Sequence, residues 1–236
     1  MEKVIKNGLV FDAIHEEPYT ADILVKDGKI AAIGENLDAP GAEVIDASGQ
    51  HVYPGFVDAH SHLGMIDSGM GFEGSDCNEP TDPLTPQLRG LDGFYAMDPD
   101  VHTAAAAGVT TVCTGPGSAN VVGGTFMAVK TYGKRVDNMV INPCVAMKCA
   151  FGENPKRVYR TANNASRMAT ASKLRELILK TIEYDRKIKE AGDDPTKLPK
   201  FDFKLDAMLP VIRKEIPLKA HAHRTDDIFT AIRIAK

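Results

Sequence analysis

The 236-residue sequence lacks an apolar stretch long enough to cross a bilayer, and its first residues lack the hydrophobic segment of a signal peptide. Its four cysteines show no CxxC spacing, which predicts free thiols in a reducing compartment, with one disulfide pair as the alternative. A net charge of −4 gives no electrostatic reason to expect a nucleic acid or an anionic membrane as a partner. These absences predict a cytoplasmic protein. The contents of 43% apolar and 25% charged residues are typical of a soluble globular protein with a sizeable core.

The first fifty residues contain short β-rich runs separated by turn residues. Asp22 to Val25 and Lys29 to Ile33 alternate apolar and polar side chains, with Asp27-Gly28 between them. Both turn residues tolerate the positive φ of a type I′ turn, so this pair predicts a β-hairpin. We expect small antiparallel strands here, in too short a segment to form a stable domain alone.

The stretch from His51 to Gly64 places two histidines after a predicted strand. Val52 to Phe56 is expected to form the strand, entered through Pro54-Gly55, and the chain then reaches His60-Ser61-His62. Because side chains alternate along a strand, His60 and His62 share one face. Two neutral imidazoles there suit a divalent ion such as zinc. The alternative is a pair of surface histidines, but the strand before them and the glycine-containing loop after them favour a metal.

A second pair with the same spacing closes a later strand. Residues 217 to 223 predict this strand and place His221 and His223 on one face. Arg224 follows, and residues 225 to 227 would cap a helix over 228 to 236. Two such pairs, each closing a strand, are much rarer by chance than one.

The segment between the two pairs contains a strand and several helices. Asp98 is a predicted N-cap with Pro99 at the first helical position, and Val109 to Thr114 reads as a buried strand. Strand, helix and strand in this order predict a right-handed unit, and therefore a parallel sheet. Later helices are expected from Ser166 to Ala191 and from Phe203 to Lys214.

Residues 65 to 97 show no sustained periodicity, although a structureless connection of this length is uncommon in a compact domain. Because the segment directly follows the first histidine pair, we interpret it as a lid over the mouth of a site. For any one of its acidic residues, a solvated position is the simpler interpretation.

The nine residues around the first pair carry a resemblance to a known family. They read Pro54-Gly55-Phe56-Val57-Asp58-Ala59-His60-Ser61-His62. This run resembles the first-strand signature of the amidohydrolase superfamily, and more narrowly its imidazolonepropionase-like and metal-dependent prolidase-like branch. The resemblance implies an α/β protein with a (β/α)8 TIM-like barrel and a small N-terminal β-sandwich. It assigns residues 1–53 to the sandwich and 54–236 to about the first five strands of the barrel.

The resemblance also implies a set of site residues. His60, His62 and His221 match metal ligands, and His223 falls where relatives contact the substrate or a second metal, so either His221 or His223 remains a candidate ligand. His223 and Arg224 are the predicted substrate contacts. Lys148, in an apolar strand-like run, matches the lysine that several relatives carboxylate to bridge two metals. A lysine paired with a carboxylate, or one extending to solvent, is the equally weighted alternative.

The implied activity is hydrolysis of an amide, cyclic amide or dipeptide C–N bond by a metal-activated water. Zinc is the expected metal, as one or two ions, with iron, manganese or nickel as alternatives. The substrate would be a small molecule, and a homo-oligomer is a further expectation.

The sequence departs from the family pattern near its end. No histidine follows His223, and only about 175 residues follow the first pair, whereas a complete barrel takes about 250. The general-base aspartate of the last barrel strand is therefore expected outside this sequence. We interpret the chain as a fragment that is inactive alone. Two alternatives to the hydrolase are a noncatalytic scaffold of the same fold and a deaminase that uses the same ligands.

Overall fold

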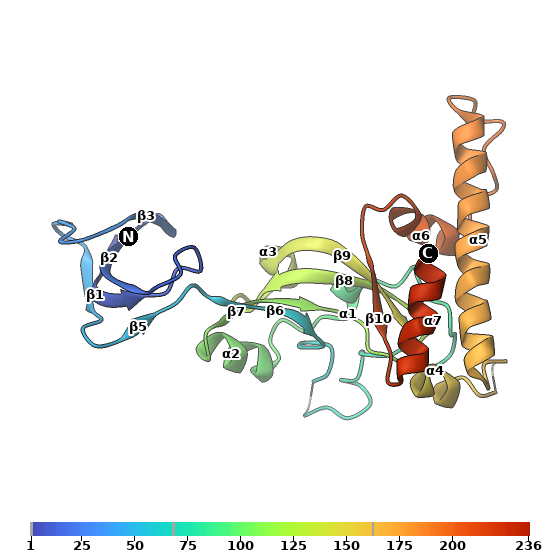
Figure 1. Ribbon diagram of the computed structural model, residues 1–236, viewed down its shortest axis with the longest axis horizontal. Coiled ribbons are helices and arrows are strands. Elements are labelled where there is room, and N and C mark those ends of the chain that lie inside the picture. The colour runs from blue at the N-terminus through green and yellow to red at the C-terminus, as the bar shows by residue number, and fades with distance from the viewer. Residues whose placement is uncertain (1, 68, 162) are drawn as a thin grey trace. The chain divides into compact units, whose positions relative to one another are not determined.

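The computed structural model describes residues 2–67, 69–161 and 163–236 (Figure 1). The chain divides into two compact units, Met1–Phe56 and Val57–Lys236. The predicted boundary lies between residues 53 and 54, inside the first of these units. No helix in the described part of the chain has the length and apolar character needed to cross a membrane.

The first unit is a five-stranded sheet in the order β3-β2-β1-β4, with β5 also paired to β1. Its strands are β1 Lys3–Val10, β2 Tyr19–Lys26, β3 Lys29–Gly34, β4 Glu43–Asp46 and β5 His51–Val52. The predicted hairpin is confirmed, because Asp27 and Gly28 join antiparallel β2 and β3 with φ of 50° and 74°. The expectation of antiparallel strands throughout is wrong. Both β4 and β5 pair with β1 in parallel, since each returns through a connection instead of a tight hairpin.

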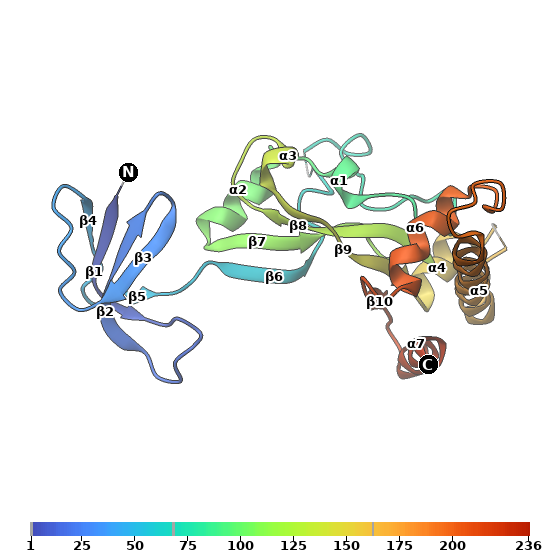
Figure 2. The ribbon, with the colours of Figure 1, turned by 90° about the horizontal axis from the view of Figure 1, so that it is seen from above.

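The second unit contains a mixed sheet in the order β10-β9-β8-β7-β6 (Figure 2). Its strands are β6 Phe56–Ser61, β7 Val109–Thr114, β8 Val122–Lys130, β9 Val140–Ala150 and β10 Leu218–His221. The predicted strand from Val52 to Phe56 is wrong, because β5 ends at Val52 and β6 begins at Phe56. Pro54 between them has no N–H to donate to a strand ladder.

The prediction of a parallel sheet is also wrong for its centre. Strand β8 runs antiparallel to both β7 and β9, whereas β9 and β10 pair in parallel. A parallel connection requires a crossover of a dozen or more residues. Only residues 115–121 separate β7 from β8, so the chain reverses there.

The sheet is curled, and a side chain on one of its outermost strands reaches the backbone of the other. Lys219 on β10 donates a hydrogen bond to the carbonyl of Ala59 on β6, with 2.5 Å between Nζ and O. In the β8–β9 ladder the register shifts at three places, including Val122/Gly124. Such irregularities bend a strand and increase its twist, which accounts for the curvature.

Some helices of this unit begin at side-chain caps, and the one at Asp98 was predicted, whereas the predicted cap at residues 225–227 is wrong because the helix there already begins at Thr225. The Asp98 carboxylate accepts the Asp100 N–H at 3.0 Å, and the Ser166 hydroxyl accepts the Ala169 N–H at 3.1 Å. Leu174 on the longest helix packs into a buried cluster with Met147 of β9. The helices are α1 Gly90–Gly93, α2 Pro99–Ala106, α3 Val136–Met139, α4 Glu153–Val158, α5 Arg167–Ala191, α6 Phe203–Ile212 and α7 Thr225–Ala235.

Gly124 lies at a register shift in β8, where the backbone leaves no room for a side chain. Its φ is +113°, and a Cβ there would lie 2.3 Å from the carbonyl oxygen of Leu88. We expect Gly124→Ala to lower the free energy of unfolding by about 2–4 kcal/mol, measured by urea denaturation. Gly123→Ala is the matched control, because its Cβ would meet the Pro116 side chain at an ordinary 3.4 Å. Equal losses in the two variants would contradict this account.

Candidate metal centre

The first histidine pair lies at the end of β6 and faces the aromatic ring of Phe126 on β8. The ring centroids of His60 and His62 are 5.4 Å apart, and they lie 5.2 Å and 5.9 Å from that of Phe126. His62 Nδ1 lies 2.8 Å from the carbonyl oxygen of Gly115. Because a carbonyl only accepts, Nδ1 carries the proton and Nε2 keeps a lone pair for a metal.

The second pair lies at the end of β10. The rings of His221 and His223 are 4.5 Å apart, and His221 Nε2 lies 3.4 Å from His223 Nδ1. Asn154 on α4 places its Nδ2 at 3.3 Å from His221 Nε2. Glu153 Oε2 lies 3.2 Å from His223 Nδ1. The start of α4 therefore contacts both histidines.

Two lysines lie on the same inner face of the curled sheet. Lys148 on β9 and Lys219 on β10 are partners in the parallel register. Their Nζ atoms lie 5.7 Å and 4.7 Å from the centroid of Phe126. Lys148 is only 1% exposed, and in the described part of the chain no carboxylate pairs with it. Four cationic or basic side chains therefore surround one phenyl ring.

This environment favours the neutral forms of the basic groups. Burial, reinforced by the nearby charges of Lys148 and Lys219, lowers the pKa of His60 from 6.5 to about 4. Burial also lowers the pKa of His221, with smaller effects from His223 and Lys148. The pKa of Lys148 is lowered as well, mainly by burial. Neutral imidazoles are the form that binds metals, so these histidines need not lose a proton first.

The donor chemistry fits a divalent metal, but the donors lie in pairs. Within residues 2–67, 69–161 and 163–236, no three side chains of His, Cys, Asp or Glu are close enough together to hold one ion. The charge of Lys148 lowers the pKa of one histidine in each pair, His60 and His221. The structure thus brings His60, His62, Lys148 and His221 to one face without joining them in one ligand shell.

Arg224 does not join this group. Its Nη2 lies 3.4 Å from the carboxylate of Asp226 in the first turn of α7. The carboxylate and the arginine are both exposed, so the pair lies in solvent. The prediction that Arg224 contacts a substrate receives no support from this geometry.

Four residues near the histidines were missed by the sequence analysis. Lys219 was detectable, because strand alternation places it on the face of His221. Phe126, Glu153 and Asn154 come from other elements, and their sequence context carries no signal of a site.

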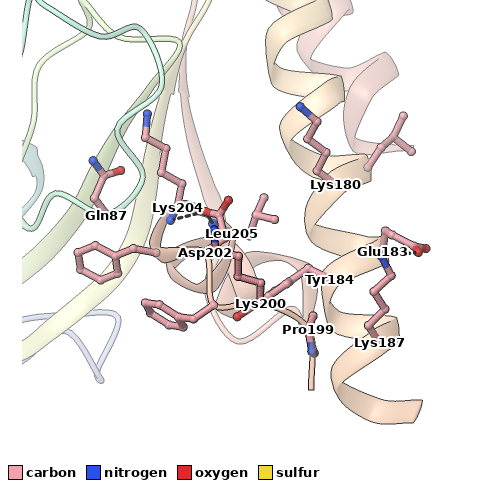
Figure 3. Close-up of a pocket in the computed structure, with 13 residues that line it drawn as sticks. Gln87, Lys180, Glu183, Tyr184, Lys187, Pro199, Lys200, Asp202, Lys204 and Leu205 are labelled. Carbon is pink, nitrogen blue, oxygen red and sulfur yellow. Dashed lines mark hydrogen bonds and ion pairs between the residues drawn. The ribbon is translucent and has the colours of Figure 1, made fainter. Parts of the chain in front are cut away.

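A large hollow of the second unit lies away from the histidines, between α5 and the segment leading into α6 (Figure 3). It has a volume of about 950 Å³, and Tyr184, Lys187 and Phe203 are among its lining residues. No histidine lines it. We therefore place the candidate site at the histidine pairs, where the metal-binding donors are.

The geometry defines a class of protein: a mixed α/β fold with imidazole pairs closing two strands of a curled sheet. No protein-family model matches the chain. An amidohydrolase of known structure from Thermotoga maritima MSB8 is 43% identical, with a TM-score of 0.93 over 99% of this chain and 61% of that chain. Amidohydrolase tasK of Hapsidospora irregularis is 29% identical over 237 residues, which cover 89% of this chain and 24% of the relative.

Shorter matches have more specific names. A D-hydantoinase from Geobacillus stearothermophilus is 57% identical over 65 residues, 28% of this chain and 13% of its own length. A dihydroorotase from Solibacter usitatus is 34% identical over 116 residues, 49% of this chain and 22% of its own length. These similarities support the amidohydrolase superfamily as the family of this chain. It spans less than a quarter of the length of each of these curated relatives.

The charges around His60 generate a titration prediction. Burial is the larger cause of the lowered pKa of His60 and remains in Lys148→Met, but this variant removes a nearby positive charge that disfavours imidazolium, so we expect the pKa of His60 to rise above about 4 without reaching 6.5. The measurement is an NMR titration of the imidazole resonances in metal-free protein. Lys134→Met serves as the control, because Lys134 is not among the groups that shift His60. An unchanged His60 pKa in Lys148→Met would contradict the assigned cause.

The same shift predicts how stability depends on pH. Because the folded protein holds the pKa of His60 below its unfolded value, the unfolded chain binds the proton first as pH falls. We expect the free energy of unfolding to decrease between pH 6.5 and about 4, and His60→Asn to weaken this dependence. Urea denaturation at several pH values measures it. The same slope in both proteins would show that His60 is not responsible.

Proposed function

We propose that the whole protein is a metal-dependent amidohydrolase that opens a cyclic amide C–N bond, and that the curled sheet forms the first strands of a (β/α)8 barrel. The observation that carries the proposal is the convergence of two histidine pairs and a buried lysine on one sheet face. The names of the relatives, which include hydantoinase and dihydroorotase, support the cyclic amide class. We place this enzyme in the cytoplasm, acting on a small molecule.

The proposed ligands are His60, His62, Lys148 and His221, with zinc as the first choice and iron, manganese or nickel as alternatives. A divalent ion bound there would polarise the scissile carbonyl and acidify the attacking water. The Gly115 carbonyl orients His62 by accepting its Nδ1 proton, so that Nε2 is presented as the donor. His223 lies beside His221 and is the proposed substrate contact from this strand.

Lys148 has the surroundings required for a further role. Burial lowers its pKa and so increases the fraction of neutral amine. A neutral amine adds CO2 to form a carbamate and releases one proton, and the carbamate provides two oxygen donors. We propose this modification as the means by which the two histidine pairs are linked into one site. The proton-accepting aspartate implied by the family is not assigned to any residue of this chain.

Metal content tests the ligand assignment. We expect the purified protein to retain near-stoichiometric metal by elemental analysis, and His60→Ala/His62→Ala to lose most of it because two donors are removed. His102→Ala is the control, since His102 lies on α2 and outside the pairs. Folded wild type and variant with equal metal content would contradict the assignment.

Activity tests the proposed reaction. We expect the metal-loaded whole protein to hydrolyse hydantoin or 5,6-dihydrouracil, followed as loss of ultraviolet absorbance of the ring. Chelation should abolish the activity and added zinc should restore it. A folded, metal-loaded protein that leaves a panel of cyclic amides intact would refute this function.

A further inference from the structure

The turn from β9 into α4 brings a carboxylate to the second histidine pair. The Phe151 N–H donates to the carbonyl of His221 at 2.9 Å, so the backbone after β9 is fixed to the end of β10. Gly152 follows with a φ of +81°, and Glu153 is the first residue of α4. Glu153 Oε2 then lies 3.2 Å from Nδ1 of His223. The carboxylate therefore reaches this histidine from an element that is tied to the same strand end.

Nδ1 of His223 has two acceptors nearby. Glu153 Oε2 lies 3.2 Å from it, and His221 Nε2 lies 3.4 Å from it. The carboxylate is the stronger acceptor, because hydrogen bonds to an ionised group are roughly twice as strong as neutral ones. The lone pair of His221 Nε2 is also shared, since the Asn154 amide nitrogen lies 3.3 Å from it and donates to it. Glu153 is therefore the acceptor that can hold the Nδ1 proton of His223.

This contact sets the tautomer of the His223 ring. A carboxylate only accepts, so Nδ1 of the neutral ring carries the proton when it pairs with Glu153. Nε2 then keeps its lone pair and can accept a hydrogen bond from a substrate N–H. Without the carboxylate, the ring could carry its proton on either nitrogen. The choice of tautomer thus decides whether His223 offers a donor or an acceptor at Nε2.

Arg167 holds Glu153 in the orientation that this contact requires. Arg167 begins α5, and its Nη2 binds Glu153 Oε1, which leaves Oε2 for His223. The same guanidinium donates from Nε to Asp227 Oδ1 on α7 at 2.9 Å. The side chain of Asp227 is only 4% exposed, whereas that of Glu153 is 47% exposed. A buried carboxylate therefore anchors the rigid fork that restrains the half-exposed one.

We propose that Glu153 is a positioning residue that holds His223 in the Nδ1-protonated tautomer and thereby presents Nε2 to the substrate. Arg167 and Asp227 form the support that orients Glu153. A carboxylate on the second nitrogen of a histidine fixes both the ring orientation and the tautomer. The inference rests on the proposed function for the identity of the substrate, whereas the tautomer of His223 is a property of the chain itself.

The tautomer can be measured in metal-free protein. NMR correlation spectra of isotope-labelled histidine, recorded at an alkaline pH that keeps the ring neutral, distinguish a protonated Nδ1 from a protonated Nε2. We expect His223 to be protonated at Nδ1 in the wild type and to lose this preference in Glu153→Ala. Glu153→Gln should restore it, because the amide oxygen still accepts. Glu176→Ala is the matched control, since Glu176 forms an exposed ion pair with Lys180 on α5.

Kinetics of the metal-loaded whole protein test the consequence for the reaction. We expect Glu153→Ala to lower kcat/KM for hydantoin about 10- to 100-fold, which is the usual effect of removing a group that orients a histidine at a metal site. Glu153→Gln should stay within about 3-fold of the wild type, as should Glu176→Ala.

Together the two measurements separate this inference from the proposed function. A change of tautomer in Glu153→Ala, with no hydrolysis of any cyclic amide by the wild type, supports the positioning role and refutes the hydrolytic function. Hydrolysis that Glu153→Ala leaves unchanged supports the function and overturns the positioning role. A wild-type ring protonated at Nε2, or a loss in Glu153→Ala that Glu153→Gln does not restore, also overturns it.

Discussion

The curvature of the five-stranded sheet is the constraint on which the candidate centre depends. In a flat sheet, the ends of β6 and β10 would be separated by three intervening strands. Here Lys219 on β10 reaches the Ala59 carbonyl on β6, and Phe126 on the central strand lies beneath both lysine and histidine side chains. Register shifts and the left-handed Gly124 within β8 produce the bend. Sheet geometry and site geometry thus have one physical origin.

Burial of basic groups on the inner face of that bend has a cost and a chemical consequence. Removing Lys148 from water without a carboxylate partner disfavours its charged form, and the same environment lowers the pKa of His60 and His221. A core selected for stability alone would be expected to replace such a lysine with an apolar residue. Neutral nitrogen donors are what a metal requires, so the unfavourable burial is consistent with a binding role.

The short helix α4 connects the centre to its surroundings. Glu153 contacts His223, Asn154 contacts His221, and Arg157 lines a neighbouring hollow. Gly152 allows this arrangement, because its φ is +81° and a Cβ would lie 2.5 Å from the carboxylate of Asp227 on α7. One tight turn after β9 therefore brings groups with different chemical roles to the same strand ends.

The features that the sequence alone could predict are those that depend on residues close together in the chain. The Asp27-Gly28 turn and the Asp98 cap depend on neighbouring residues, and both occur as expected. The spacing of two residues within each histidine pair, His60 with His62 and His221 with His223, predicts that both side chains of a pair lie on one face of the strand. Contacts between distant segments were decided only by the tertiary structure. These include the reversal of β8, the position of Phe126 between the lysines and histidines, and the contacts of α4. They depend on connection length, bulges and curvature, which act over many residues and leave no periodic signal in the sequence.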